Sequence, residues 1–260
     1  MNILDRLADA ARGRVAANKA KRPLADVRRA AERADRGDFP FERALAREGT
    51  AFICECKKAS PSKGLISPDF PYLDIARAYE DAGADCISVL TEPTMFLGSD
   101  AYLREIAEAV SVPCLRKDFV VDEYMLYEAK LLGAKAALLI CAITEGSRLA
   151  EYAAICDELG LTALVEAHDE REVRRALDAG ARVVGVNNRD LRDFSVDPSR
   201  SRALRDMIPR GVLFVSESGV RDRGDVELLE AAGADAVLVG EALMRAPDKR
   251  AKLAELRGEA

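Results

Sequence analysis

Charged and amide side chains close several apolar, strand-like runs of this chain. The runs lie near residues 51–57, 114–117, 162–166, 183–187 and 212–217, and the polar residues that end or follow them are Glu55, Lys57, Lys117, Glu166, Asn187, Arg189 and Glu217. Ions at the ends of buried strands are costly unless they converge on one another or on a ligand. Lysines and glutamates are also groups that hold and move protons. The pattern therefore indicates a site for acid–base chemistry.

A sequence pattern that occurs four times shows which elements must position these residues. Four helix-like stretches end in a glycine that is followed at once by a strand-like run, at Gly83, Gly133, Gly180 and Gly233. Glycine suits the left-handed position that closes a helix. At the other end, amphipathic stretches follow five aspartates that are plausible N-caps: Asp100, Asp122, Asp169, Asp197 and Asp222.

The order of elements is therefore strand, loop, helix, repeated. Strands are expected near residues 51–57, 85–90, 112–116, 136–141, 162–166, 183–187, 212–216 and 236–239. Eight such units predict an α/β protein with the (β/α)8 TIM-barrel fold. The alternative, an open doubly wound sheet, would need fewer strands and usually a glycine-rich loop after the first, which this sequence lacks.

The first 49 residues differ from the rest, because they have helical periodicity but no convincing strand. We interpret residues 1–49 as an N-terminal helical extension and residues 50–260 as the barrel, together forming a single domain. The extension either packs on the barrel wall or forms a partial lid over one barrel mouth, and periodicity does not choose between the two.

Composition excludes several classes of protein. The net charge is −6 with acidic and basic residues interspersed, which argues against a protein that mainly binds nucleic acid or an anionic membrane. No apolar run is long enough to span a bilayer, and the N-terminus lacks the apolar stretch of a signal peptide. We expect a cytoplasmic protein.

A metal site is not expected. The six cysteines have no C-x-x-C pair, and five lie in or beside apolar runs where thiols behave as small buried side chains. Cys54 and Cys56 are too few to hold a metal alone. The only histidine, His168, is interpreted as a loop residue after the fifth strand rather than as a ligand or base.

Strand geometry then predicts how the polar residues converge. Side chains alternate along a barrel strand, so Glu55 and Lys57 share one face and the two thiols share the other. The thiols suit the helix layer, which leaves Glu55 and Lys57 to point inward. Each charged residue taken alone could be an exposed loop charge. Seven polar residues at the C-terminal ends of strands, where this fold places catalytic groups, favour one active site.

Short turns supply a candidate phosphate site. Ser218-Gly219 and Gly240 follow the last two strands, where backbone N–H groups of these barrels usually bind phosphate. The Ser60–Gly64 turn after the first strand could add donors or serve as a mobile loop. Glu241 beside Gly240 would disfavour an anion, so its side chain is expected to point away. These glycines could equally be ordinary turn residues.

Six segments together resemble a known family: residues 55–64, 87–92, 115–119, 164–166, 185–191 and 216–220. On these segments, in register over nearly the whole chain, the sequence resembles indole-3-glycerol phosphate synthase of tryptophan biosynthesis. The resemblance implies a lyase that closes 1-(2-carboxyphenylamino)-1-deoxyribulose 5-phosphate to indole-3-glycerol phosphate with loss of carbon dioxide and water. It implies no metal or organic cofactor.

The resemblance also implies roles for individual residues. Lys117 would be the acid at the ribulose carbonyl oxygen, and Lys57 would hold the substrate carboxylate. Glu166 and Lys57, supported by Glu55, would serve the later proton transfers, whose division between the two lysines stays open. Most of the remaining residues would contact substrate: Asn187 and Glu217 at the ribulose part, Ser60, Gly219 and Gly240 at the phosphate, and Phe119 and Leu139 at the aromatic ring. Ser218 would lie at the edge of the site, and Arg189 would brace the acidic cluster.

Two other functions compete with this one. A related phosphosugar barrel, such as a phosphoribosylanthranilate isomerase, would be expected to use a Cys/Asp acid–base pair. A Schiff-base aldolase would be recognised because borohydride would trap its carbonyl substrate on a lysine. A silent barrel that only binds a phosphometabolite would have no use for Lys57, Lys117 and Glu166. As partners we expect a small phosphorylated substrate and no nucleic acid or membrane. The protein is expected to be a monomer or weak dimer, able to associate with other tryptophan-pathway enzymes.

Overall fold

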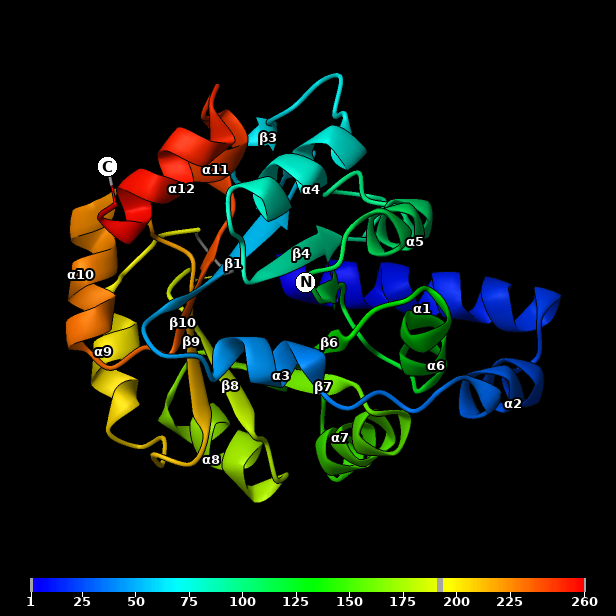
Figure 1. Ribbon diagram of the computed structural model, residues 1–260. Helices are drawn as coiled ribbons and strands as arrows, with labels where there is room; N and C mark the ends of the chain where they lie inside the picture. Colours follow the sequence, from blue (N-terminus) through cyan, green and yellow to red (C-terminus); the bar gives the residue numbers. More distant parts are fainter. Residues whose placement is uncertain (1, 191–193, 260) are drawn as a thin grey trace.

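The described part of the chain folds around a closed barrel of parallel strands (Figure 1). The computed structural model describes residues 2–190 and 194–259, so Leu191 of the motif at 185–191 lies outside it. The barrel strands are β1 (Ala51–Cys56), β4 (Cys86–Leu90), β5 (Cys114–Lys117), β6 (Ala136–Ile140), β7 (Thr162–Ala167), β8 (Val183–Asn187), β9 (Leu213–Glu217) and β10 (Ala236–Val239). Each pairs with its sequence neighbours, and β10 pairs with β1. The predicted barrel is confirmed.

Helices surround the strands. They are α4 (Tyr72–Asp81), α5 (Asp100–Ala109), α6 (Tyr124–Leu131), α7 (Arg148–Leu159), α8 (Glu170–Asp178), α9 (Ser199–Arg205), α10 (Arg223–Ala231), α11 (Glu241–Arg245) and α12 (Lys249–Arg257), with the 3-10 turn η1 (Cys141–Ile143). A two-stranded hairpin that the sequence pattern does not indicate, β2 (Ala59–Ser60) and β3 (Gly64–Leu65), follows β1. None of the described helices is long and apolar enough to cross a membrane.

Most helix ends follow the sequence signals. The four junction glycines have φ of +86°, +87°, +79° and +79°, a region that side chains with a Cβ rarely enter. Asp169 and Asp222 are the extended residues before α8 and α10, and each carboxylate accepts a backbone N–H of the first turn. These two aspartates are N-caps, as predicted.

The other predicted caps differ in position. Asp100 does not cap α5: Ser99 is the extended residue whose hydroxyl accepts the first free N–H, while Asp100 pairs with Arg116 at 2.9 Å. Asp122 and Asp197 each lie one residue before the N-cap of their helix, and their carboxylates accept the backbone N–H two residues further on. All three aspartates therefore stand at helix starts without being the capping residue.

Within residues 2–190, three helices precede the barrel: α1 (Ile3–Lys21), α2 (Leu24–Arg33) and α3 (Pro40–Leu45). Figure 1 shows α1 and α2 beside α6, on one side of the ring of helices. Helix α3 packs against β1 and β4, and its Glu42 binds Arg182 just before β8, so it lies at the N-terminal end of the strands. Leu7 of α1 and Phe41 of α3 belong to the same buried core as the strands.

Alternation along β1 places its thiol side chains and its acidic side chain on opposite faces, as predicted. Cys54 and Cys56 are fully buried and lie near α12, where Arg257 and Lys249 act on their thiols, and burial raises the pKa of both. Glu55 faces the barrel interior, where its carboxylate contacts Lys57. The polar face of β1 therefore opens on the same space as the ends of the other strands.

Candidate active site

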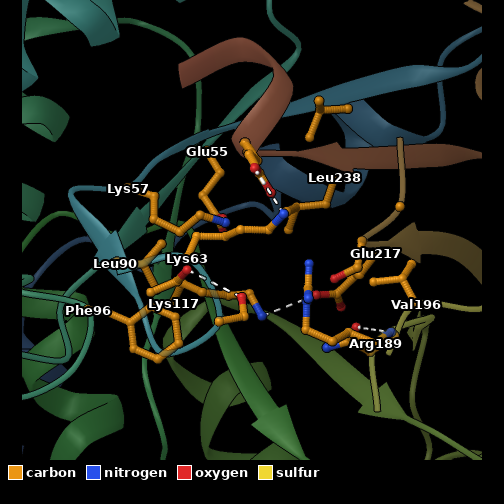
Figure 2. Close-up of a pocket in the computed structure, with 18 of the residues that line it drawn as sticks. Glu55, Lys57, Lys63, Leu90, Phe96, Lys117, Arg189, Val196, Glu217 and Leu238 are labelled. Carbon is orange, nitrogen blue, oxygen red and sulfur yellow. Dashed lines mark hydrogen bonds and ion pairs between the residues drawn. The ribbon is translucent and has the colours of Figure 1, made fainter. Parts of the chain in front are cut away.

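One cavity of about 830 Å³ opens at the C-terminal ends of the barrel strands. Twelve residues singled out from the sequence line it: Glu55, Lys57, Ser60, Lys117, Phe119, Glu166, Asn187, Arg189, Glu217, Ser218, Gly219 and Gly240. Figure 2 shows Glu55, Lys57, Lys117 and Glu217 directed into it: the first two from the end of β1, Lys117 from β5 and Glu217 from β9. The fold thus brings together residues that lie up to 185 positions apart in sequence, from 55 to 240.

Lys117 is the centre of the polar cluster. Its Nζ lies 3.2 Å from Oε2 of Glu166 and 3.1 Å from Oε2 of Glu217, and its side chain is 14% exposed. Burial opposes its charge, but the surrounding carboxylates Glu217, Glu166 and Glu55 raise the pKa of Lys117 above its usual value. Lys117 is therefore an ammonium group held at a fixed place between two carboxylates, which is the state that a general acid needs.

The two glutamates beside Lys117 differ in protonation. Burial, with repulsion from Glu166 and Glu55, raises the pKa of Glu217 to about 7 although Lys117 opposes this. Burial also acts on Glu166, but Lys117, His168 and the Asn187 amide hold the pKa of Glu166 below its usual value. Two neighbouring carboxyls whose pKa values are driven apart can take different acid–base roles. At neutral pH, Glu166 is therefore the ionised member of the pair.

Lys57 and Glu55 form a second pair on β1. Nζ of Lys57 lies 2.6 Å from Oε1 of Glu55, and the Ser88 hydroxyl donates to Oε2 at 3.3 Å. Both side chains lie close to Gly240. A Cβ added there would stand 2.6 Å from Oε1 of Glu55 and 2.7 Å from Nζ of Lys57. Gly240 therefore makes room for the pair, a role that its turn position does not suggest.

A second glycine, in mid-strand, makes room for Glu217. Gly185 lies on β8, and a Cβ there would stand only 2.2 Å from Oε1 of Glu217. The sequence carries a signal for this residue, because glycine inside an otherwise apolar strand often marks a close approach. At the end of the same strand, Asn187 donates to Oε2 of Glu166 at 3.2 Å and accepts from the backbone N–H of Arg189.

Arg189 and His168 differ from their expected roles. The Arg189 guanidinium donates to the carbonyl of Phe194 at 3.0 Å, and no contact among the described residues joins it to the acidic cluster. His168 does follow β7 in a loop, but Nε2 lies 3.4 Å from Oε1 of Glu166 and Nδ1 lies 3.0 Å from Oε2 of Glu172. Sequence reasoning misses this contact, although Glu166-x-His168 has strand spacing and His168-x-x-x-Glu172 has helical spacing.

One side of the cavity is apolar. Its walls are Ile3, Leu4 and Leu7 of α1 together with Leu90, Phe96, Phe119, Leu138 and Ile140. The rings of Phe96 and Phe119 are 6.1 Å apart. The expectation that Leu139 forms part of this slot is wrong, since β6 alternates and Leu138 and Ile140 are the residues that face inward. Helix α1 thus supplies part of the cavity wall at this mouth, in addition to packing beside α6.

The loops that follow β1, β9 and β10 line the cavity with small residues and cations. Ser60, Ser62, Gly219 and Gly240 lie there with Lys63, Arg221 and Arg245. Glu241, whose side chain is expected to avoid an anion, binds Arg245 at 3.0 Å and Lys63 at 3.3 Å. Its charge is thus offset by two cations, and the Lys63 contact links the β2–β3 hairpin to α11.

Metal ligands are not gathered anywhere in residues 2–190 and 194–259: no group of three or more histidine, cysteine, aspartate or glutamate side chains there could hold an ion. The cysteines in this part of the chain are free and buried.

Comparison with known proteins gives a consistent result. A family model described as indole-3-glycerol phosphate synthase matches residues 4–256. A protein of that name from Ruminiclostridium cellulolyticum is 52% identical over 259 residues, which cover 99% of this chain and 100% of the relative. One from Leuconostoc mesenteroides is 48% identical over 260 residues, 99% of each chain. Among solved structures, thiamine phosphate pyrophosphorylase from Pyrococcus furiosus is similar, with a TM-score of 0.61 over 84% of this chain and 96% of that chain. The sequence identity is 16%, so this similarity concerns the fold alone.

Proposed function

The chain belongs to the indole-3-glycerol phosphate synthase family and is a decarboxylating lyase of tryptophan biosynthesis, and we propose that Lys117 is the acid that starts its ring closure. The observation that carries this proposal is the position of the Lys117 ammonium between Glu166 and Glu217, inside a cavity lined by both apolar and cationic residues. The substrate, 1-(2-carboxyphenylamino)-1-deoxyribulose 5-phosphate, has an aromatic ring at one end and a phosphate at the other, so the two kinds of lining residue match its two ends.

In the first step, the ring carbon that bears the carboxylate forms a bond with C2 of the ribulose part. The carbonyl electron pair moves to oxygen, which takes a proton from Lys117. The bond to the carboxylate then breaks, carbon dioxide leaves, and its electron pair restores the aromatic ring. Lys57 holds the carboxylate until that step, and Glu55 at 2.6 Å keeps the Lys57 ammonium in place.

In the last step, the new hydroxyl at C2 leaves as water with a proton from an acid, and a base removes a proton so that the indole double bond forms. Glu166 is the ionised carboxylate of the pair and is the base in this proposal. Glu217 and Asn187 position the ribulose hydroxyls, with Ser218 and Arg189 at the edge of the site. Ser60, Gly219 and Gly240 contact the phosphate, and Phe119 contacts the aromatic ring.

The experiment is a turnover assay without added metal, in which the product is followed by indole fluorescence. Lys117→Met is expected to lower kcat by at least about 10³-fold, because a positioned acid and a fixed charge are both lost. Lys135→Met is the matched control, since Lys135 is an exposed residue before β6, at the other end of the barrel. Undiminished turnover in Lys117→Met would refute the role of Lys117. Absence of product with the unaltered protein would refute the reaction itself and favour the isomerase-like or silent barrel.

We also propose how the protein exists in the cell. Residues 1–49 and 50–260 form one domain, a proposal supported by the shared core that includes Leu7 and Phe41. A single cooperative unfolding transition is the expected result. We further propose a cytoplasmic monomer or weak dimer that associates with other tryptophan-pathway enzymes; the small, water-soluble substrate of the family fits the cytoplasmic location. Sedimentation velocity, alone and with those enzymes, tests the assembly, and cell fractionation tests the location.

A further inference from the structure

His168 lies between two carboxylates, one in the active site and one outside it. Its Nδ1 is 3.0 Å from Oε2 of Glu172, and the same oxygen accepts the backbone N–H of His168 at 2.9 Å. Its Nε2 is 3.4 Å from Oε1 of Glu166. The Glu166 side chain is 2% exposed, that of Glu172 7% and that of His168 16%, so water screens these contacts poorly.

The geometry sets the charge of the ring. An ionised carboxylate only accepts hydrogen bonds, so Nδ1 must carry a hydrogen toward Glu172. A neutral ring would then direct the Nε2 lone pair at Oε1 of Glu166, which is repulsive. Nε2 is buried and has no hydrogen-bond partner among the described residues, so its 3.4 Å approach to Oε1 of Glu166 is a contact between charges rather than a hydrogen bond. Protonation of Nε2 removes the repulsion and creates an ion pair with Glu166.

Glu166 is contacted asymmetrically as a result. Its Oε2 receives the contacts from Lys117 and Asn187, at 3.2 Å each, while Oε1 faces His168. The ring therefore occupies the side of the carboxylate away from Lys117. Any rotation of the Glu166 carboxylate that moved Oε2 out of reach of Lys117 would also break the contact with His168.

We propose that His168 is a positioning residue: an imidazolium, fixed by Glu172, that keeps Glu166 ionised and keeps its Oε2 directed at Lys117. This inference rests on the proposed role of Glu166 as the base. It explains why a buried carboxylate beside another carboxylate can stay ionised, because Glu166 has a cation on each side.

Other charged groups around the ring agree with this assignment. Burial opposes the charge of His168, but the hydrogen bond to Glu172 and the charges of Glu166, Glu172 and Glu217 raise its pKa above the usual value. Lys117 of β5 is the nearby cation, and it is itself paired. On the helix side, Arg175 donates to the carbonyls of Cys141 and Thr144, and burial raises the pKa of the Cys141 thiol to about 12, so the thiol stays neutral.

The first test uses the fact that the chain has one histidine. In untagged protein, a ring ¹³C–¹H NMR signal therefore reports His168 without assignment. We expect its pKa to lie above about 6.5, the ordinary histidine value, and to fall by about 1 to 3 units in Glu166→Gln, the range for loss of an opposite charge at this distance. A His168 that titrates at its ordinary value and is unchanged in Glu166→Gln would overturn the proposal.

The second test uses two replacements of His168, each of which reproduces the position of only one of the two ring nitrogens. In H168N the asparagine amide reaches only the Nδ1 position, and in H168Q the glutamine amide reaches the Nε2 position without charge. We expect H168N to lower kcat up to about 100-fold with little change in KM, because Glu166 loses both its charge partner and its orientation. We expect H168Q to recover part of kcat, since its amide restores a donor to Oε1 of Glu166.

In both variants the acidic limb of the kcat/KM profile should move to higher pH by about 1 to 3 units, because the cation that stabilises ionised Glu166 is gone. A third variant, Glu172→Gln, leaves the ring in place but removes its orienting charge, and should shift the same limb in the same direction. Wild-type profiles in all three folded variants would overturn the proposal. If Glu166→Gln turned over normally, the base assignment would fail instead, and the NMR titration would still decide whether His168 pairs with Glu166.

Discussion

Gly185 offers the sharpest test of how tightly the catalytic carboxylates are packed. The residue lies in the middle of β8, and its missing side chain leaves the space that the Glu217 carboxylate occupies. In Gly185→Ala the new Cβ would stand 2.2 Å from Oε1 of Glu217 and 3.2 Å from Cδ1 of Leu164. The contact with Leu164 needs an adjustment of only a few tenths of an ångström, so the carboxylate is the group that must move.

The size of the movement follows from these distances. Ordinary van der Waals contact with a Cβ begins at 3.4 Å, so Glu217 must retreat by 3.4 − 2.2 = 1.2 Å. Oε2 of Glu217 is 3.1 Å from Nζ of Lys117, and a shift of that size removes one of the two carboxylates that position the lysine. Misplacement of a catalytic group by about 1 Å costs about 100-fold in rate. Overpacking of the barrel interior should also cost about 1 to 3 kcal/mol of stability.

The assay compares kcat and KM for indole-3-glycerol phosphate formation with the free energy of unfolding. Gly13→Ala is the matched control, since Gly13 lies on an exposed face of α1 with no atom within 4 Å of the added Cβ, and it should keep kcat and gain up to about 1 kcal/mol. The double variant Gly185→Ala/Glu217→Asp shortens the carboxylate side chain and should recover part of kcat. Wild-type kcat in folded Gly185→Ala would refute the packing argument.

Three other perturbations follow from the same cavity. Gly240→Ala should lower kcat/KM about 100-fold, because its Cβ displaces the Lys57–Glu55 pair. If a crystal structure of the variant showed the pair in place although activity was lost, this reason would be wrong. Glu217→Gln should be more stable relative to the unaltered protein at pH 8 than at pH 5, by up to about 3 kcal/mol in the free energy of unfolding measured with denaturant. The reason is that a carboxyl whose pKa rises from 4.5 to about 7 on folding destabilises the folded protein as pH rises through that range. A difference between the two proteins that does not change with pH would contradict this reason. Leu7→Ser should raise KM about tenfold with a smaller effect on kcat, because α1 forms part of the apolar wall, and an unchanged KM in the folded variant would remove α1 from the substrate site.

Much of the fold can be predicted because its signals are local. Glycines after four helices, apolar runs of strand length and aspartates before amphipathic stretches all act within a few residues of themselves, so the starts of the eight barrel strands are predicted to within two residues. The error at Asp100 is of the same local kind. Ser99 and Asp100 are both good caps, and only the backbone, extended at Ser99, decides between them.

The membership of the site can be predicted for a related reason. Parallel strands of a closed barrel end at the same mouth, so polar residues at strand ends must meet there whatever their distance in sequence. This rule brings Glu55 and Lys117 to one cavity, and it says nothing about residues that act through close approach. Gly185, Gly240 and His168 are missed or given other roles, because what matters about each is a contact with a side chain from another part of the chain.

The sequence by itself thus determined the order of elements, the barrel and the set of polar groups at its mouth, because these depend on local propensity and on the alternation of strands. Only the tertiary structure decided how those groups share charge. Glu166 and Glu217 both lie within 3.2 Å of Lys117, yet Glu166 has His168 and Asn187 on its other contacts while Oε1 of Glu217 faces the backbone of Gly185. Burial costs a carboxylate its charge unless partners restore it, and those partners come from strands and loops that meet only in the folded barrel.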